Sequence, residues 1–115
     1  MRVPAGFCGI AGLKPTSGRV PRTGHIVGPM TGALDSLTVI GPLARYVEDL
    51  TLVLGIIAGP DMEDPAIVSL PLGDPDIVDI KTLKIAMHSN NGLVEPTPET
   101  TEAVNRAAKA LSEAG

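Results

Sequence analysis

The residues that could support chemistry begin with a glycine-rich stretch near the N-terminus, Gly6-Phe7-Cys8-Gly9-Ile10-Ala11-Gly12-Leu13-Lys14-Pro15-Thr16. A phosphate-binding loop needs a lysine and a hydroxyl residue directly after its last glycine, at the start of a helix. Here Leu13 separates Gly12 from Lys14, and Pro15 follows. A dinucleotide-binding turn would need a strand before the glycines and a helix after them, and the sequence predicts neither. The stretch therefore fits neither kind of phosphate site.

Possible nucleophiles and metal ligands are few and scattered. Cys8 is the only cysteine, and no histidine stands in a recognisable spacing to it, so we interpret it as a buried structural thiol. His25 and His88 show no zinc-ligand spacing, which predicts loop and strand-end residues and no metal site. The serines lie outside any Gly-x-Ser-x-Gly elbow and are interpreted as turn and cap residues: Ser17, Ser36, Ser69, Ser89 and Ser112.

Composition limits the class of protein. With 115 residues, 43% of them hydrophobic, a mean hydropathy of +0.24 and a net charge of -4, the chain is typical of one globular domain at most. Phe7 and Tyr46 are the only aromatic residues, so aliphatic residues and alanine must fill the core. No apolar run reaches the ~18 residues of a membrane span, and no signal peptide is evident. We therefore expect a cytoplasmic protein without membrane contact.

The charge is unevenly distributed. Residues 1–45 hold five of the nine lysines and arginines and one acid, Asp35, and so carry +4, whereas residues 46–115 carry -8. Lys14, Arg19 and Arg22 have no interleaved aromatic residues and belong to no nucleic-acid motif. We therefore interpret these cations as partners of loop carbonyls or acids and predict no nucleic-acid binding.

The elements of residues 1–60 follow from glycine, proline and apolar spacing. Residues 4–32 are so rich in glycine and proline that they predict an ordered loop, packed through Phe7, Ile10, Leu13, Val20 and Ile26. Residues 37–40 are a short β-branched run that predicts a buried strand or strand end. Residues 47–58 predict a helix, with Glu48 and Asp49 in its first turn and apolar residues on most sides.

The C-terminal part predicts a strand, a loop and a helix. Residues 61–82 alternate acids with prolines and predict an extended surface connection. Residues 83–87 alternate apolar and polar side chains, which predicts a strand packed against the following helix. Thr97 and Pro98 predict the N-cap and first residue of a helix over 98–113, and Glu102 and Arg106 have the spacing of a surface ion pair. Residues 83–115 would then be the first two-thirds of a βαβ unit.

Two blocks of sequence are similar to the amidase signature family. The first is Arg2-Val3-Pro4-Ala5-Gly6-Phe7-Cys8-Gly9-Ile10-Ala11-Gly12-Leu13-Lys14-Pro15-Thr16-Ser17-Gly18-Arg19-Val20-Pro21, which resembles the stretch that ends the signature. The second resembles the family's next block: Ile40-Gly41-Pro42-Leu43-Ala44-Arg45, Val47-Glu48-Asp49-Leu50 and Ile57-Ala58-Gly59-Pro60-Asp61. Residues 83–86 and 110–115 resemble the β/α unit that follows, so the similarity covers essentially the whole chain.

The resemblance implies an enzyme that hydrolyses or transfers carboxylic amides with a serine, a bridging serine on a cis peptide and a lysine, and without a metal or organic cofactor. A neutral lysine can accept the serine proton through the bridging hydroxyl, and backbone amides of a glycine-rich loop stabilise the oxyanion. In the family the nucleophile directly precedes the Ile-Arg-x-Pro-Ala element, and Met1 occupies the place of that isoleucine. No catalytic, cofactor or metal residue is therefore assigned. Gly6 and Tyr46 depart from the family's usual residues.

The resemblance also sets the expected fold and partners. We expect an α/β chain that is one incomplete segment, residues 1–115, of an α/β/α mixed-sheet fold, made of residues 1–60, 61–82 and 83–115. Its expected partners are the remainder of an amidase chain or a second copy, through uncovered apolar surface around Val47, Leu50, Val53 and Ile57. A small amide substrate is expected only for the complete parent. The alternative is a non-catalytic remnant that serves as a structural or interaction module.

Overall fold

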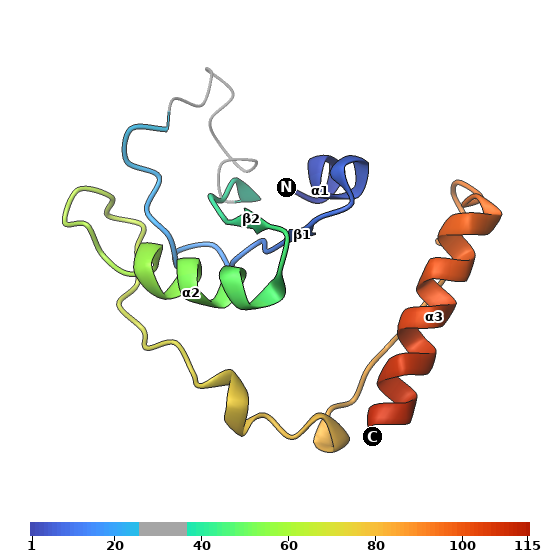
Figure 1. The fold of residues 1–115 in the computed structure, drawn as a ribbon. Helices are drawn as coiled ribbons and strands as arrows, with labels where there is room; N and C mark the ends of the chain where they lie inside the picture. The colour runs from blue at the N-terminus through green and yellow to red at the C-terminus, as the bar shows by residue number, and fades with distance from the viewer. Residues whose placement is uncertain (26–36) are drawn as a thin grey trace. The chain divides into compact units, whose positions relative to one another are not determined.

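The computed structural model describes residues 1–25 and 37–115, which form two units, Met1–Leu72 and Gly73–Gly115 (Figure 1). The first unit contains α1 (Arg2–Cys8), β1 (Ala11–Gly12), β2 (Leu43–Ala44) and α2 (Val47–Ile57). The second contains the 3-10 turns η2 (Pro75–Ile77) and η3 (Ile80–Thr82) and the helix α3 (Pro98–Ala114). The described residues therefore combine helices with a small antiparallel sheet, and the unit boundary lies inside the predicted connection 61–82.

α1 corrects the expectation that residues 4–32 begin as loop. Pro4 lies in the first turn of α1, where a helix needs no N–H donor, so proline does not prevent the helix. Gly9 ends it in the left-handed region at φ 62°, and its N–H donates to the carbonyl of Ala5. Only Ala5 is buried, and Phe7 is 88% exposed, so the predicted packing of Phe7 is wrong. Of the other residues expected to pack there, Ile26 lies outside the described residues.

β1 and β2 form an antiparallel pair in which Ala11 lies opposite Ala44 and Gly12 opposite Leu43. Beyond the pair, the N–H of Leu13 donates to the carbonyl of Pro42 at 3.0 Å. Residues 38–40, part of the predicted strand over 37–40, have no ladder partner in the described chain. The pairing lies beyond the Gly41-Pro42 dipeptide instead, because Pro42 supplies a carbonyl acceptor and Gly41 permits close approach to Leu13.

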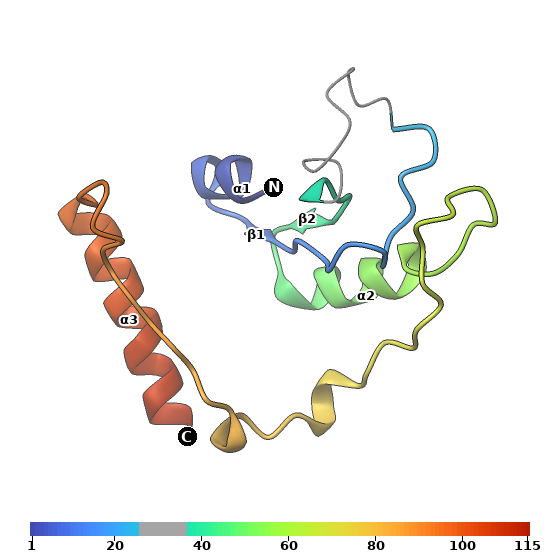
Figure 2. The same cartoon turned by 180° about the vertical axis from the view of Figure 1, so that it is seen from behind.

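α2 confirms the predicted helix 47–58 to within one residue, since Ala58 is its C-cap. It contacts both β1 and β2, as the two opposite views agree (Figures 1 and 2). Leu50 is buried in this contact, so it does not belong to the uncovered surface that the sequence predicts. The uncovered apolar side chains are Val47, Leu52 and Ile56, which are 66%, 65% and 74% exposed.

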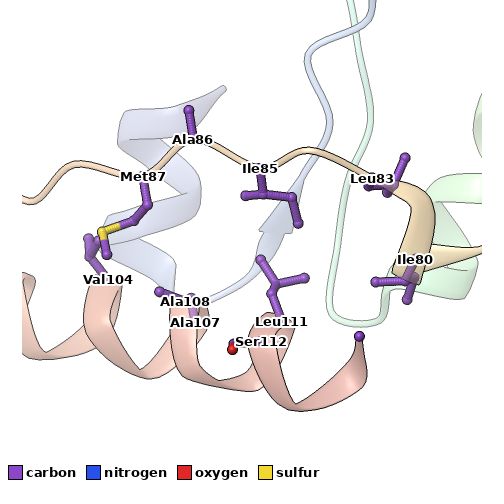
Figure 3. A pocket seen from close by; sticks show the side chains of 11 residues that line it. Ile80, Leu83, Ile85, Ala86, Met87, Val104, Ala107, Ala108, Leu111 and Ser112 are labelled. Atoms are coloured by element: carbon purple, nitrogen blue, oxygen red, sulfur yellow. The ribbon is translucent and has the colours of Figure 1, made fainter.

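The second unit pairs an extended segment with α3. Residues 83–87 are not a strand, because the described residues offer them no neighbouring strand with which to form a ladder. The side chains of Ile85 and Met87 nevertheless point toward α3, whereas Ala86 points away from it (Figure 3). Met87 lies over Val104, and Ile85 lies over Leu111. α3 confirms the predicted helix 98–113, and the hydroxyl of Thr97 accepts the N–H of Thr100 at 3.4 Å.

Burial is sparse throughout the described residues. Those that are buried all belong to the first unit: Ala5, Pro15, Val20, Pro42 and Leu50. No described residue of Gly73–Gly115 is buried. The aliphatic core expected from composition is therefore present only as a small cluster around the β1–β2 pair and α2.

Candidate functional site

A cleft of about 330 Å³ lies at the start of α1, next to the place where the family resemblance puts the nucleophile. The described residues that line it combine apolar side chains with two cations and include no acid: Met1, Arg2, Val3, Lys14, Leu37, Thr38 and Val39. Arg2 and Lys14 make the cleft electropositive, a property that attracts anionic or carbonyl groups. Among residues 1–25 and 37–115, no carboxylate or imidazole that could act as a general base lines the cleft.

Close approaches at two glycines occur near residues of this cleft. A Cβ atom at position 41 would meet the carbonyl oxygen of Leu13 and would lie 2.6 Å from Cδ of Pro15 and 2.7 Å from Sδ of Met1. A Cβ atom at position 12 would lie 2.7 Å from Cδ2 of Leu43. At position 41 the closest atom is a backbone oxygen, so only glycine fits there. At position 12 the closest atom is the end of the flexible Leu43 side chain, which could shift.

Arg19 ties the chain that follows α2 to the glycine-rich segment. Its Nη1 donates to the carbonyls of Leu70 at 2.8 Å and Pro71 at 3.3 Å, and its own carbonyl accepts the N–H of Gly59 at 3.0 Å. The neighbouring carbonyl of Gly18 accepts the N–H of Val68 at 2.9 Å. The predicted pairing of cations with loop carbonyls is therefore confirmed for Arg19.

Two carboxylates complete this attachment. Asp64 accepts the backbone N–H of Arg22 at 3.0 Å and that of Ala66 at 2.9 Å, and these bonds lower its pKa. Asp61 accepts the backbone N–H groups of Asp64 and Glu63 and a hydrogen bond from Thr23. Together they lower the pKa of Asp61 from 3.8 to about 2. Both carboxylates are therefore charged at neutral pH and serve as backbone acceptors.

The side chains that could act as nucleophiles are scattered over the described residues. Cys8, at the end of α1, is a free and exposed thiol, which corrects the prediction that it is buried. Ser69, Ser89 and Ser112 are exposed, and within the described residues their hydroxyls make no hydrogen bond to a base. Ser17, His25 and His88 are exposed as well, and Ser36 lies outside the described residues.

Metal ligands and membrane-spanning helices are absent from the same residues. Within residues 1–25 and 37–115, no three of the histidine, cysteine, aspartate and glutamate side chains come together as metal ligands. None of the helices in that part of the chain has the length and apolar character needed to cross a bilayer.

Comparison with known proteins decides the family. The family model described as "Amidase" matches residues 1–115, the whole chain. The chain belongs to the amidase family. This agrees with the two sequence blocks, which the β1–β2 pair brings together in space.

Curated relatives match this amidase-family chain along its whole length. It is 39% identical to a glutamyl-tRNA(Gln) amidotransferase subunit from Methanospirillum hungatei and covers 26% of that protein. It is 36% identical to the protein of the same name from Sulfurihydrogenibium and covers 23% of it. It is 33% identical to the vitamin D3 hydroxylase-associated protein of Gallus gallus and covers 25% of it. The chain thus spans about a quarter of the length of these relatives. No solved structure matches it significantly.

Two features of the site have no clear signal in the sequence. Arg19 reaches carbonyls more than 50 positions away in the sequence, and no local pattern signals such a partner. In the sequence, Gly41 indicates only the end of a strand. A Gly-Pro pair is also compatible with a close backbone approach at the glycine, followed by a carbonyl acceptor at the proline.

Proposed function

We propose that this chain supplies the part of an amide hydrolase or amidotransferase that directly follows the catalytic serine. The observation that carries the proposal is that the two amidase-like blocks form one structural unit. β1 from the first block pairs with β2 from the second, and Leu13 and Gly59 add backbone hydrogen bonds between the blocks. Segments that are similar to the family in sequence thus also support each other physically.

In this proposal the catalytic groups lie outside these 115 residues. The serine nucleophile, the bridging serine, the lysine and the oxyanion loop would face the cleft beside Met1 and Arg2 in the complete enzyme. The role of the present residues would be to close that cleft from one side through Gly12, Gly41 and Lys14. Neither a metal nor an organic cofactor takes part.

The proposed fold of the complete enzyme is an α/β/α core built on a mixed sheet, of which residues 1–115 are one segment. The unpaired, extended residues 83–87 and the exposed side of α2 would be covered by other parts of that core. The substrate class is a carboxylic amide. The relatives named as amidotransferase subunits support transfer of the amide nitrogen as well as hydrolysis.

The first prediction is that the 115-residue chain alone hydrolyses neither amides nor activated esters. Loss of one oxyanion donor lowers kcat by roughly 10²- to 10³-fold, so loss of the nucleophile, its relay and all donors leaves no measurable turnover. The measurement is hydrolysis of a chromogenic ester and a chromogenic anilide, together with labelling by a fluorophosphonate probe. Labelling at Ser17, Ser36, Ser69, Ser89 or Ser112, with turnover abolished by the matching alanine substitution, would contradict the proposal.

A non-catalytic interaction module is the second candidate, and the exposed apolar side chains of α2 favour it. The two candidates differ in the coding sequence upstream of Met1. An open reading frame that encodes the two serines and the lysine supports the enzyme, and an in-frame stop codon supports the module.

A further inference from the structure

The turn between the extended segment and α3 carries two adjacent asparagines followed by glycine, Asn90-Asn91-Gly92. The Oδ1 atom of Asn91 accepts the N–H groups of Leu93 at 3.0 Å and Val94 at 3.2 Å. The Oδ1 atom of Asn90 accepts the N–H of Gly92 at 2.7 Å. All of these residues are exposed, and Gly92 has a φ of 76°.

We propose that Asn91 is a site of spontaneous deamidation, with the backbone nitrogen of Gly92 as the nucleophile. That nitrogen loses its proton and bonds to Cγ of Asn91, the Cγ–Nδ2 bond breaks, and ammonia leaves with the proton. Water then opens the cyclic imide at one of its two carbonyls. The products are aspartate, or isoaspartate in which the main chain runs through Cβ and Cγ. The reaction needs water alone and no change of oxidation state.

Two features of the turn favour reaction at Asn91. The two N–H donors on Oδ1 draw electron density from Cγ, as donors at an oxyanion site do, and so make Cγ more electrophilic. Gly92 has no side chain to block ring closure, and it moves freely in φ and ψ. Asn90 lacks this second feature, because the residue that follows it is Asn91.

Asn105 provides a control within the same chain. It lies in the middle of α3, where the backbone must open before its own ring can close. The chain contains no glutamine, and Asn90, Asn91 and Asn105 are its only side-chain amides. A gain of mass by amide hydrolysis therefore has only three possible origins.

One contact of the turn opposes the reaction. The hydrogen bond from the Gly92 N–H to Oδ1 of Asn90 stabilises the protonated nitrogen and must break before that nitrogen attacks. Asn90 therefore slows the reaction, and its removal exposes the nucleophile while leaving the Asn91-Gly92 pair intact.

The test is incubation of the chain at neutral and mildly alkaline pH, followed by cleavage after glutamate and mass spectrometry. Such cleavage separates the peptide that ends at Glu95, with Asn90 and Asn91, from residues 103–113, with Asn105. We expect the mass gain in the first peptide at least about tenfold faster than in the second, because α3 must open locally. The rate should rise with pH, since the attacking nitrogen must lose a proton.

Two variants sharpen the test. Asn91→Asp keeps Oδ1 and abolishes the mass gain in the first peptide, whereas Asn90→Ala increases the rate. Fragmentation that locates the gain at Asn90, equal rates in the two peptides, or a rate in Asn90→Ala no faster than in the unchanged chain would overturn the proposal.

Discussion

Gly41 lets two distant segments meet because it lacks a side chain. A methyl group at this position would press against the carbonyl of Leu13 and the ring of Pro15, both of which belong to tightly held backbone. At Gly55, in the middle of α2, a Cβ would meet no described atom within 4 Å apart from its chain neighbours and the nearby backbone of α2 itself. A side chain would therefore clash at Gly41 but would be tolerated at Gly55.

Alanine substitution should separate these two cases. We expect Gly41→Ala to lower the free energy of unfolding by about 1–3 kcal/mol through overpacking. We expect Gly55→Ala to raise it by about 0.5–1 kcal/mol, because alanine is the better helix former. Urea unfolding followed by circular dichroism measures both. Equal effects of the two substitutions would show that Gly41 is not closely packed.

The lowered pKa of Asp61 predicts that the first unit loses stability at acidic pH. Its pKa falls from 3.8 in the unfolded chain to about 2 in the folded chain, so the folded state holds this proton more weakly. The stabilisation is therefore fully present above about pH 4 and is lost as the pH falls toward about 2.

The measurement is thermal unfolding of the chain between pH 5 and pH 2 together with Asp61→Asn, which cannot ionise. We expect the substituted chain to lose less of its melting temperature over this interval. Glu95→Gln, at an exposed carboxylate with no hydrogen bond in the described residues, is the control and should leave the slope unchanged. Parallel curves for Asp61→Asn and the unchanged chain would refute the assignment.

At the scale of elements, α3 is stabilised by a cap at its N-terminus that involves only neighbouring residues. The hydroxyl of Thr97 accepts the N–H of Thr100, and Pro98 occupies the first helical position. We expect Thr97→Ala to destabilise α3 by about 1 kcal/mol and Thr97→Ser to restore most of that loss, because serine keeps the accepting oxygen. Helical circular dichroism measures the change, and a serine variant as weak as the alanine variant would exclude the cap as its cause.

Helices were predictable from the sequence because their determinants lie within a few residues. The apolar period of 47–58 and the Thr-Pro start of 98–113 located both long helices correctly. An ion pair was predicted between Glu102 and Arg106. The ion pair observed on α3 instead joins Lys109 to Glu113 at 3.7 Å. Both pairs are four residues apart on an exposed helix, so little energy separates them.

Strands and the site could be predicted only in part. The alternation of residues 83–87 correctly indicated that Ile85 and Met87 face α3. A strand also needs a neighbouring strand, which a sequence pattern does not supply. The family resemblance placed the nucleophile directly before Met1 but predicted no cleft. The contacts of Gly41 and Arg19 join residues far apart in the chain, and no local pattern predicted them. Such contacts depend on the folded path of the backbone.

At the scale of the whole molecule, exposed apolar side chains predict association. Leu52 and Ile56 lie one turn apart on the uncovered side of α2, with Val47 near its start. Contiguous apolar patches on soluble proteins usually find a partner. We therefore expect concentration-dependent self-association and binding of a hydrophobic dye.

Paired charge substitutions test this expectation. Leu52→Glu with Ile56→Lys should weaken association by about tenfold or more in sedimentation, since truncation of a central contact residue commonly removes over 1 kcal/mol. Leu93→Lys is the control, because Leu93 is 87% exposed in the turn before α3. A chain that remains monomeric at high concentration and binds no dye would exclude an apolar interface on α2.

The β1–β2 pair has a further consequence during synthesis on the ribosome. Ala11 is translated well before its partner Ala44, and at roughly 5–20 residues per second this delay lasts about 2–7 s. During that interval β1 lacks its partner strand, because β2 has not yet been made. The N-terminal segment therefore remains only partly folded during this delay. The first unit can complete its folding only after α2 has been translated.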